Sequence, residues 1–384
     1  MTRPFLPFAR PDIGEEEIQA VAETMRSGWL TTGPNSATFE TEFADFLGGG
    51  RQAIAVNSAT SGLHLAYEAV GVGPGTEVLV PTWTFTATAE AVRYLGADPV
   101  FVDVDPATLC IDLADAERRV TERTIAIAPV HYAGLAVPDG ALRAFADRHG
   151  LKVVEDAAHS FPTLNEGTLV GAGSHAVTVF SFYATKTMTT GEGGMVVTPD
   201  AALASRMKTM RLHGINRDVF DRYSSSKPSW HYDVVAPGYK YNLTDTAAAM
   251  GRVQLRRTPE MVAKRTSIAE RFDAAFAELP VTLPSHAPEG SSHAWHIYNL
   301  RLRSDASVGR DRFIELMAER GVGTSVHFIP LHLQPYWRDT YHLAPEQFPV
   351  ASAQFERSLS LPIFSAMTDE DVQHVIESVQ GILA

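Results

Sequence analysis

Two stretches decide the fold of this chain: Val153-Val154-Glu155-Asp156-Ala157-Ala158-His159 and Phe180-Ser181-Phe182-Tyr183-Ala184-Thr185-Lys186. Each begins in an apolar run without polar alternation, which is typical of a strand buried on both faces of a sheet. A carboxylate ends the first run, and a lysine follows the second. In a parallel sheet, neighbouring strands present their carboxyl ends at one edge. We therefore expect Asp156 and Lys186 to face a common site.

Short apolar runs of the same kind recur along the first half of the chain, with helical patterns between most of them. They lie at Ala53–Val56, Val78–Val80, Val100–Val102, Ile125–Val130, Val153–Val154, Val177–Phe182 and Met195–Val197. Strands that alternate with helices indicate an α/β fold whose sheet is covered on both faces. The sequence therefore predicts a large domain with a mostly parallel seven-stranded sheet.

Two amphipathic helices are expected before the first strand. Asp12 and Glu15 form a capping-box pattern at the start of the first helix, and Gly28 ends it. The second helix is expected to end at Gly48, where three glycines follow one another.

The chain after residue 211 has a different organisation. Residues 212–241 mix glycine, proline, serine, aromatic and charged residues without a period, so we interpret them as a long functional loop. A helix starting near Thr244 is expected to end before Pro259. These boundaries predict a large domain over residues 1–258 and a smaller α+β domain over residues 259–384.

Composition excludes several classes of function. The formal net charge of −13 argues against nucleic acid or an anionic membrane surface as a partner. Cys110 is the only cysteine, which excludes an internal disulfide and fits a reducing cytoplasm. Pro4 and Pro7 interrupt the apolar run that a signal peptide needs. We expect a cytoplasmic protein without a membrane span or a metal site.

Lys186 is the lysine with the most unusual setting among the six in the chain. It stands between two expected strands, among small and polar residues, and Gly191-Glu192-Gly193-Gly194 follows it. A loop lysine is more often a surface residue, but Asp156 at a neighbouring strand end changes that expectation. Pyridoxal phosphate needs such a lysine to bind its aldehyde covalently and an acid to keep its pyridine nitrogen protonated.

The cofactor's phosphate would need backbone donors at the start of a helix. Asn57-Ser58-Ala59-Thr60-Ser61-Gly62 follows a strand and opens a helix with small and hydroxyl residues. The N–H groups of Ala59 and Thr60, with the hydroxyls of Ser58, Thr60 and Ser181, would surround the phosphate. An ordinary helix cap is the alternative interpretation of this segment.

The cofactor's ring would need a cover on its outer face. Phe85 follows another strand end and is our choice for it, with packing in the core as the alternative for Phe85 or Trp83. His159 could stack near the ring, support Asp156, or serve only the structure.

Several segments together resemble the sugar aminotransferases of the DegT/DnrJ/EryC1/StrS family. They are Gly28–Pro34, Asn57–Thr60, Glu155–His159, Ser181–Lys186, Gly238–Asp245, Val326–Phe328 and Leu331–Leu333. The likeness runs from about residue 8 to the C-terminal helix. It is closest to the branch that aminates C4 keto-sugars, through Pro129-Val130-His131-Tyr132-Ala133-Gly134 and residues 238–245.

The resemblance implies a large domain of fold-type I, the fold of aspartate aminotransferase, with pyridoxal 5'-phosphate as cofactor. Lys186 matches the lysine that binds the cofactor and carries the proton, and Asp156 matches the partner of the pyridine nitrogen. Phe85 matches the stacking aromatic, and Ser181 with Ser58–Thr60 matches the phosphate ligands. Asn242 matches an asparagine that reaches the phosphate from the neighbouring subunit, which implies a homodimer with shared active sites.

The implied reaction transfers an amino group from L-glutamate to a ketone on a nucleotide-diphosphate-linked sugar, releasing 2-oxoglutarate. A 4-keto-6-deoxyhexose or 4-keto-pentose is the expected acceptor. The substrate's diphosphate needs cations, and its sugar needs polar walls. The residues that we expect to contact the substrate are Trp29, Thr31, Gly33, Arg217, Tyr239, Lys240, Tyr241, His327 and His332.

There are four alternatives to this hypothesis. Amination at C3 of the sugar is one. A dehydratase on the same fold replaces the lysine with histidine, so Lys186 speaks against it. A regulator that binds the cofactor without turnover would lose part of the site, and no part is lost. A nicotinamide oxidoreductase is rejected, because Gly171-Ala172-Gly173 opens a strand where a helix is required.

Overall fold

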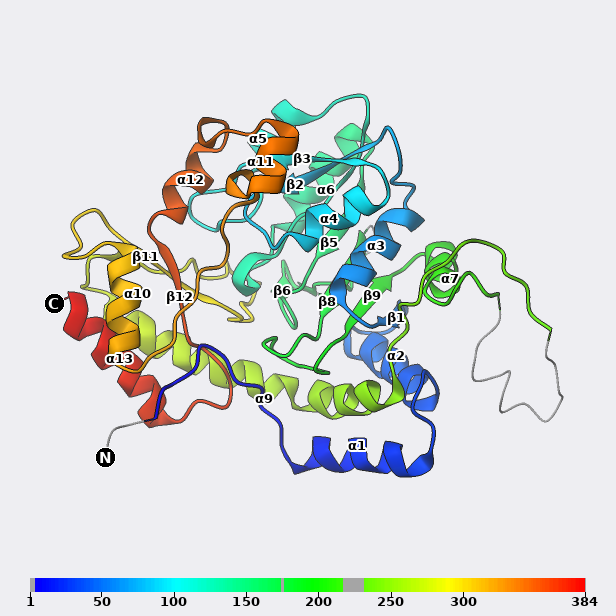
Figure 1. Cartoon of the computed structure of the whole chain (residues 1–384), viewed down its shortest axis with the longest axis horizontal. Coiled ribbons are helices and arrows are strands. Elements are labelled where there is room, and N and C mark those ends of the chain that lie inside the picture. Colours follow the sequence, from blue (N-terminus) through cyan, green and yellow to red (C-terminus); the bar gives the residue numbers. More distant parts are fainter. Residues whose placement is uncertain (1–3, 174–175, 217–230, 384) are drawn as a thin grey trace.

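A seven-stranded sheet lies at the centre of the computed structural model, which describes residues 4–173, 176–216 and 231–383 (Figure 1). Its strands are β1 (Gln52–Val56), β2 (Glu77–Pro81), β3 (Asp98–Val102), β4 (Thr124–Ile127), β5 (Lys152–Asp156), β8 (Ala176–Ser181) and β9 (Gly194–Thr198), in the order β1-β9-β8-β5-β4-β2-β3. β9 runs antiparallel to its neighbours β1 and β8, and the other pairs are parallel. The prediction of a mostly parallel seven-stranded sheet is confirmed.

Helices follow most strands of the sheet. α3 (Ala59–Ala69), α4 (Ala87–Tyr94) and α7 (Ala201–Met210) lie together on one face, where α3 contacts the other two, and α5 (Leu113–Arg119) and α6 (Asp139–His149) follow β3 and β4. α3 packs very closely, since a Cβ atom on Gly62 would lie 2.7 Å from a methyl carbon of Val179 in β8. A larger residue there would push α3 away from the sheet. The first turn of α3 is thereby held beside the end of β8.

The other face of the sheet is covered by α2 (Pro34–Phe46) and α9 (Asp245–Phe276), with α1 (Glu15–Ser27) lying along α9 (Figure 1). Phe39 and Phe43 of α2 contact the rings of Phe180 and Phe182. Successive residues of β1 point to opposite faces of the sheet. Ile54 accordingly packs in the core under α3, and Ala55 packs in the core under α2.

Two expected helix boundaries differ in the structure. The cap of α1 is Gly14, whose N–H donates to the Glu17 carboxylate at 2.8 Å, so the capping pattern lies two residues later than expected. Asp12 instead forms an ion pair with Arg257. Helix α9 does not end before Pro259 but continues through it to Phe276. Packing of buried residues on both sides of Pro259 outweighs the loss of one backbone hydrogen bond.

A second, smaller sheet stands at the other end of the molecule. It consists of β10 (Val281–Thr282), β11 (Tyr298–Leu302) and β12 (Ser358–Leu361), all antiparallel, with α10 (Arg310–Glu319) and α13 (Asp369–Leu383) in the same core. A short hairpin, β6 (Leu164–Asn165) and β7 (Thr168–Leu169), lies apart from both sheets. No helix among the described residues is both long enough and apolar enough to cross a membrane.

The chain crosses between the core of the large sheet and the core of the small sheet more than once. Helices α11 (Pro335–Tyr341) and α12 (Pro349–Phe355) leave the small sheet and return to the large one, where Trp337 and Phe348 join its core (Figure 1). Leu6, near the N-terminus, joins the core of the small sheet. Helix α9 spans residue 258, so the division of the chain there into two domains stays a prediction.

Candidate active site

A cavity of about 440 Å³ lies where β5 and β8 end and α3 begins. The strand ends, the first turn of α3 and loops from the C-terminal third of the chain form its walls. The lining residues are Ser58, Ala59, Thr60, Leu63, Thr84, Phe85, Ala87, Val130, Asp156, Ala158, His159, Ser181, Tyr183, Thr185, Lys186, Glu192, Gly193, His296, His327 and Phe328.

Asp156 reaches this cavity as the last residue of β5, and its side chain is only 5% exposed. One carboxylate oxygen accepts a hydrogen bond from the Thr88 hydroxyl at 2.7 Å, and the other accepts from the Ala158 N–H at 3.1 Å. The Thr84 hydroxyl lies 2.9 Å from that of Thr88, which extends the chain of hydroxyls. A buried carboxylate needs such partners, and these orient it toward the cavity.

Lys186 lies in the loop that follows β8, with its side chain half-buried in the cavity wall. Burial lowers the pKa of its amine from 10.5 to about 8, against the opposing attraction of the Asp156 carboxylate. At pH 7 roughly a tenth of the amine is therefore unprotonated, far more than at a pKa of 10.5, and able to act as a nucleophile or base. The acid and the amine expected at neighbouring strand ends do line one cavity.

Three histidines stand around Lys186: His159, His296 and His327. Burial lowers the pKa of each ring, and the positive charge of Lys186 lowers each further, with the pKa of His327 falling to about 4. All three rings are therefore neutral at physiological pH. The His159 ring centroid lies 4.5 Å from that of His296 and 5.7 Å from that of Phe328.

The first turn of α3 supplies the donors expected for a phosphate. Ser58 caps the helix, and its hydroxyl oxygen accepts from the Ser61 N–H at 3.1 Å. Ala59 and Thr60 follow, and the first N–H groups of a helix have no carbonyl one turn earlier to bond. Gly194 lets β9 approach this turn, since a Cβ atom there would lie 3.0 Å from the Ala59 nitrogen.

Phe85 and Trp83 take different positions relative to the cavity. Phe85 is 59% exposed at its mouth, and its ring centroid lies 5.9 Å from that of Phe328. Trp83 is fully buried, and its ring N–H donates to the carbonyl of His327 at 3.1 Å. Phe85, our choice from the sequence, lines the cavity, and Trp83 packs in the core.

Residues Tyr239–Asn242, which we name the 239–242 segment, do not line this cavity. The Asn242 amide donates to the Thr32 hydroxyl at 2.6 Å and accepts from the Lys240 amine. The Tyr239 and Tyr241 rings stack with centroids 5.0 Å apart, over His64. The structure therefore separates Asn242 and three of the expected substrate residues from Lys186.

The Trp29–Gly33 turn also lies outside the cavity and forms the start of α2. The Gly33 N–H donates to Asp245 at 2.8 Å, as do the Asn35 and Ser36 N–H groups at 3.0 and 2.9 Å. A Cβ atom on Gly33 would collide with the Trp29 ring at 2.0 Å. Thr31 is exposed. These contacts show that the residues of the turn have a role in the fold, where they form the start of α2.

His332 and Arg217 are the remaining residues that we expected to contact the substrate. His332 is fully buried outside the cavity, with its two ring nitrogens 2.8 Å from the Thr82 hydroxyl and 2.9 Å from the Ser352 hydroxyl. Both nitrogens are occupied by the protein itself, so the ring joins a loop to the large sheet. Arg217 lies outside the described residues.

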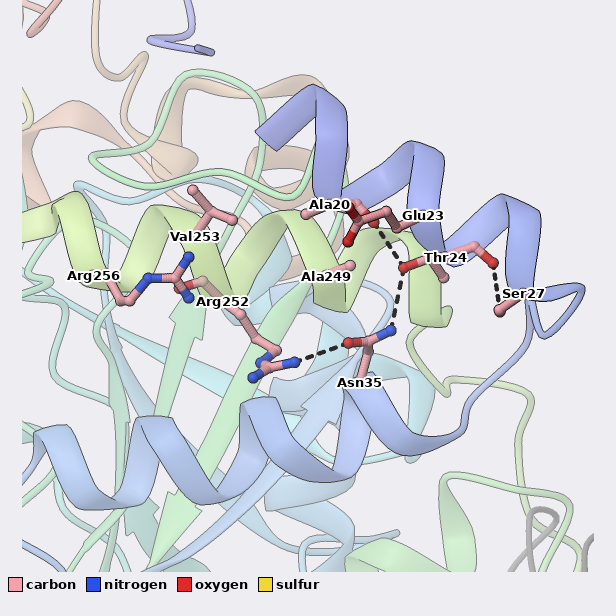
Figure 2. Close-up of a pocket in the computed structure, with 9 residues that line it drawn as sticks. All are labelled: Ala20, Glu23, Thr24, Ser27, Asn35, Ala249, Arg252, Val253 and Arg256. Carbon is pink, nitrogen blue, oxygen red and sulfur yellow. Dashed lines mark hydrogen bonds between the residues drawn. The ribbon is translucent and has the colours of Figure 1, made fainter. Parts of the chain in front are cut away.

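A second hollow lies between α1, α2 and α9 (Figure 2). Its polar side chains point toward one another: the Asn35 amide donates to the Thr24 hydroxyl at 3.2 Å and accepts from Arg252 at 3.0 Å. Arg252 also forms an ion pair with Glu42. These contacts hold the three helices together and leave the strand-end cavity as the better site for chemistry.

Sequence reasoning missed several residues that belong to the cavity. His296 and Phe328 come from loops of the C-terminal third, and Thr84 and Thr88 stand behind Asp156. Thr88 lies in the first turn of α4 and Thr84 in the loop before it, and this run of hydroxyl residues after a strand end was the usable signal. Nothing in the residues around His296 indicates that its ring reaches Lys186.

The model of the DegT/DnrJ/EryC1/StrS aminotransferase family matches residues 11–380. The spore coat polysaccharide biosynthesis protein SpsC of Bacillus subtilis is 45% identical over 381 residues, which cover 99% of this chain and 97% of that protein. The likeness therefore extends over the whole chain, including the small sheet.

Solved structures agree with this likeness. The putative sugar aminotransferase Spr1654 of Streptococcus pneumoniae in its PMP form has a TM-score of 0.91 at 32% identity, covering 98% of both chains. The same protein has also been solved in its PLP form. Helicobacter pylori PseC, an aminotransferase involved in the biosynthesis of pseudoaminic acid, has a TM-score of 0.90 at 28% identity, covering 99% of both chains.

Proposed function

Because this chain belongs to the DegT/DnrJ/EryC1/StrS aminotransferase family, we propose that it aminates a keto-sugar attached to a nucleotide diphosphate. L-glutamate is the proposed amino donor, and pyridoxal 5'-phosphate is the cofactor. The observation that carries the proposal is one cavity lined by both the Lys186 amine and the Asp156 carboxylate. The proposed setting is the cytoplasm.

The residues of the cavity fit pyridoxal phosphate at its phosphate, its pyridine nitrogen and the face of its ring. The start of α3 offers N–H groups and hydroxyls to an anion, and buried Asp156 offers a carboxylate already held by two donors. The exposed Phe85 ring is free to cover a flat ligand. Bound there, pyridoxal phosphate supplies an electron-withdrawing ring that makes the hydrogen on an amine-bearing carbon acidic.

Lys186 is the proposed proton carrier. With its pKa lowered to about 8, the amine can accept a proton from the α carbon of glutamate and return it at a different atom. The reverse sequence, with the proton delivered to the sugar carbon, completes the amino transfer. The Thr84–Thr88 hydroxyls keep Asp156 oriented, so that its negative charge favours a positive pyridine nitrogen.

The substrate's diphosphate needs more positive charge than the cavity offers. Lys186 is the only lysine among the described residues that line it, and no arginine is among them. We propose that a second copy of the chain supplies the missing groups, with its 239–242 segment placed over the cavity. Asn242 and Lys240 would then reach the cofactor phosphate and the diphosphate of the partner's site.

The position of amination is proposed to be C4 of the sugar, with C3 as the second candidate. The sequence likeness to the C4 branch at residues 129–134 and 238–245 supports this choice. His327, at the mouth beside Phe328, is the described residue best placed among the expected sugar contacts, because it alone of them lines the cavity.

The test is direct. Purified protein with pyridoxal phosphate and L-glutamate is offered UDP- and dTDP-linked sugars carrying a ketone at C4 or at C3. Formation of 2-oxoglutarate and the mass of the amino-sugar product are measured. We expect turnover of at least one 4-keto sugar. Turnover of 3-keto sugars alone would reverse the assignment of the position, and release of 2-oxoglutarate with no sugar amination would refute the sugar as acceptor.

A further inference from the structure

His296 is the one residue whose polar side chain contacts the Lys186 amine among the described residues. Its Nε2 atom lies 3.4 Å from the Lys186 Nζ atom. The ring is only 8% exposed and comes from the loop that enters β11, far along the chain from β8. Its other nitrogen, Nδ1, is buried without a hydrogen-bond partner.

A buried histidine with one unpaired nitrogen is costly, because the nitrogen has left water without gaining a protein partner. The other two rings of the cluster are better satisfied: His159 Nδ1 accepts from the Ala133 N–H at 3.3 Å, and His327 Nδ1 lies 2.9 Å from the Ser360 hydroxyl. An apolar side chain would fill the position of His296 without that cost. The contact with Lys186 is the remaining polar interaction of the ring.

We propose that His296 is a positioning residue, whose Nε2 atom accepts a hydrogen bond from the Lys186 amine and holds that amine toward the cavity whenever it is not covalently bound. The proposal rests on the aminotransferase chemistry of the family, in which this lysine is alternately bound and free. A free amine on a flexible four-carbon chain would otherwise sample many positions.

The charges around the pair exclude the alternative of a proton relay through His296. The pKa of the His296 ring is lowered well below 6.5, chiefly by burial and then by Lys186, with smaller contributions from His159, Arg265 and His327. The Lys186 amine, which the charge of Asp156 attracts, has a pKa of about 8. A proton would therefore have to move uphill from the amine to the imidazole, so the ring acts as an acceptor of a hydrogen bond and not as a base.

The experiment compares full-length wild type with His296→Gln and His296→Leu, all freed of cofactor. Glutamine places an amide oxygen near the position of Nε2, whereas leucine fills the space without an acceptor. Pyridoxal phosphate is added at a series of pH values, the bond to Lys186 is trapped with borohydride, and the modified peptide is counted by mass spectrometry. The trapping rate reports the position and pKa of the free amine and needs no sugar substrate.

For His296→Leu we expect the trapping rate at its high-pH plateau to be about tenfold below that of wild type, because the free amine is no longer held toward the cavity. The pH midpoint of the trapping rate should be lower by about one unit, because the Lys186 ammonium loses the acceptor of its hydrogen bond. His296→Gln should keep the plateau rate within about twofold of wild type and leave the pH midpoint unchanged. In the loaded enzyme, His296→Leu should lower kcat while leaving KM for the sugar unchanged.

A matched control lies in the same loop. His293 is 6% exposed and stacks on Trp295, and its Nδ1 accepts from the Trp295 N–H at 2.8 Å without reaching Lys186. His293→Gln disturbs the loop and should leave the trapping rate unchanged. If His296→Leu fails to fold, His296→Asn replaces it, because its shorter amide does not reach the position of Nε2.

The results separate this proposal from the proposed function. Three results would each overturn the role of His296. The trapping rate of His296→Leu could equal that of wild type, the rate could fall equally in His296→Gln and His296→Leu, or it could fall as much in His293→Gln as in His296→Leu. Normal trapping without turnover of any keto-sugar would instead refute the proposed substrate and leave the role of His296 intact.

Discussion

The cavity and the 239–242 segment are built in opposite ways. The cavity gathers its residues from strand ends, the start of α3 and distant loops, and Asp156 within it is 5% exposed. The 239–242 segment lies on the surface, where Lys240 is exposed and Asn242 bonds to Thr32 and Lys240. The described residues that line the first region all come from one chain. The second has polar groups that we propose act on another copy.

The largest effect should come from Lys186→Ala. This change removes both the covalent attachment of the cofactor and the proton carrier, so turnover should fall by about 10⁴-fold or more. Amino transfer and the absorption of the lysine-bound cofactor are measured together. Turnover within tenfold of wild type would show that the cavity is not the site of chemistry.

Asp156→Asn should be the next most severe change inside the cavity. The amide oxygen can still accept from the Ala158 N–H and the amide nitrogen can donate to the Thr88 hydroxyl, but the side chain carries no negative charge for the pyridine nitrogen. We expect kcat/KM to fall by about 10²- to 10³-fold, with folding preserved, since only the electrostatic interaction is lost. A variant with wild-type kinetics would separate Asp156 from the reaction.

Thr88→Val tests the residues behind the cavity. Valine keeps the shape of threonine and removes the hydroxyl that donates to Asp156 at 2.7 Å. A lost hydrogen bond to a charged group should lower kcat/KM roughly tenfold. Thr84→Val, which removes a hydroxyl one step further away, is the control and should have a smaller effect. The reverse order of the two effects would contradict the hydroxyl chain.

His332→Ala should change stability but not the affinity for substrate. Removal of a buried ring with two hydroxyl partners should lower the free energy of unfolding by about 2–4 kcal/mol, measured with denaturant, at unchanged KM. Burial lowers the pKa of His332 from 6.5 to about 4. The unfolded ring takes up a proton first, so the wild-type advantage should shrink as the pH falls from about 6.5 to 4. A raised KM for the sugar in this variant would indicate instead that His332 contacts the substrate.

The sequence predicts the cavity better than the surface for a physical reason. Apolar runs such as Val153–Val154 are buried on both faces, so they can only be central strands, and the residue at the end of each strand must lie at the sheet's edge. Lys186 and Asp156 were found in that way. His296 was not, because its approach to Lys186 depends on how the small sheet packs against the large one.

Local structure also explains residues that the family resemblance alone would assign to the substrate. Gly33 is required by the Trp29 ring and by Asp245, and His332 is held by two hydroxyls. Helix α9 passes Pro259 because its buried face continues, a feature of packing that a single proline does not reveal. A motif identifies such a position, but only the contacts of the residue in the structure show whether it stabilises the fold or binds substrate.

The central claim is that one chain's cavity is completed by another chain's 239–242 segment, and mixing two inactive variants tests it. Lys186→Ala and Asn242→Ala are purified separately, mixed, and allowed to exchange subunits. If Asn242 serves the partner's cavity, a mixed dimer holds one site with both changes and one with neither, so activity should recover to about a quarter of wild type. No recovery, with mixed dimers demonstrated by mass, would contradict the account.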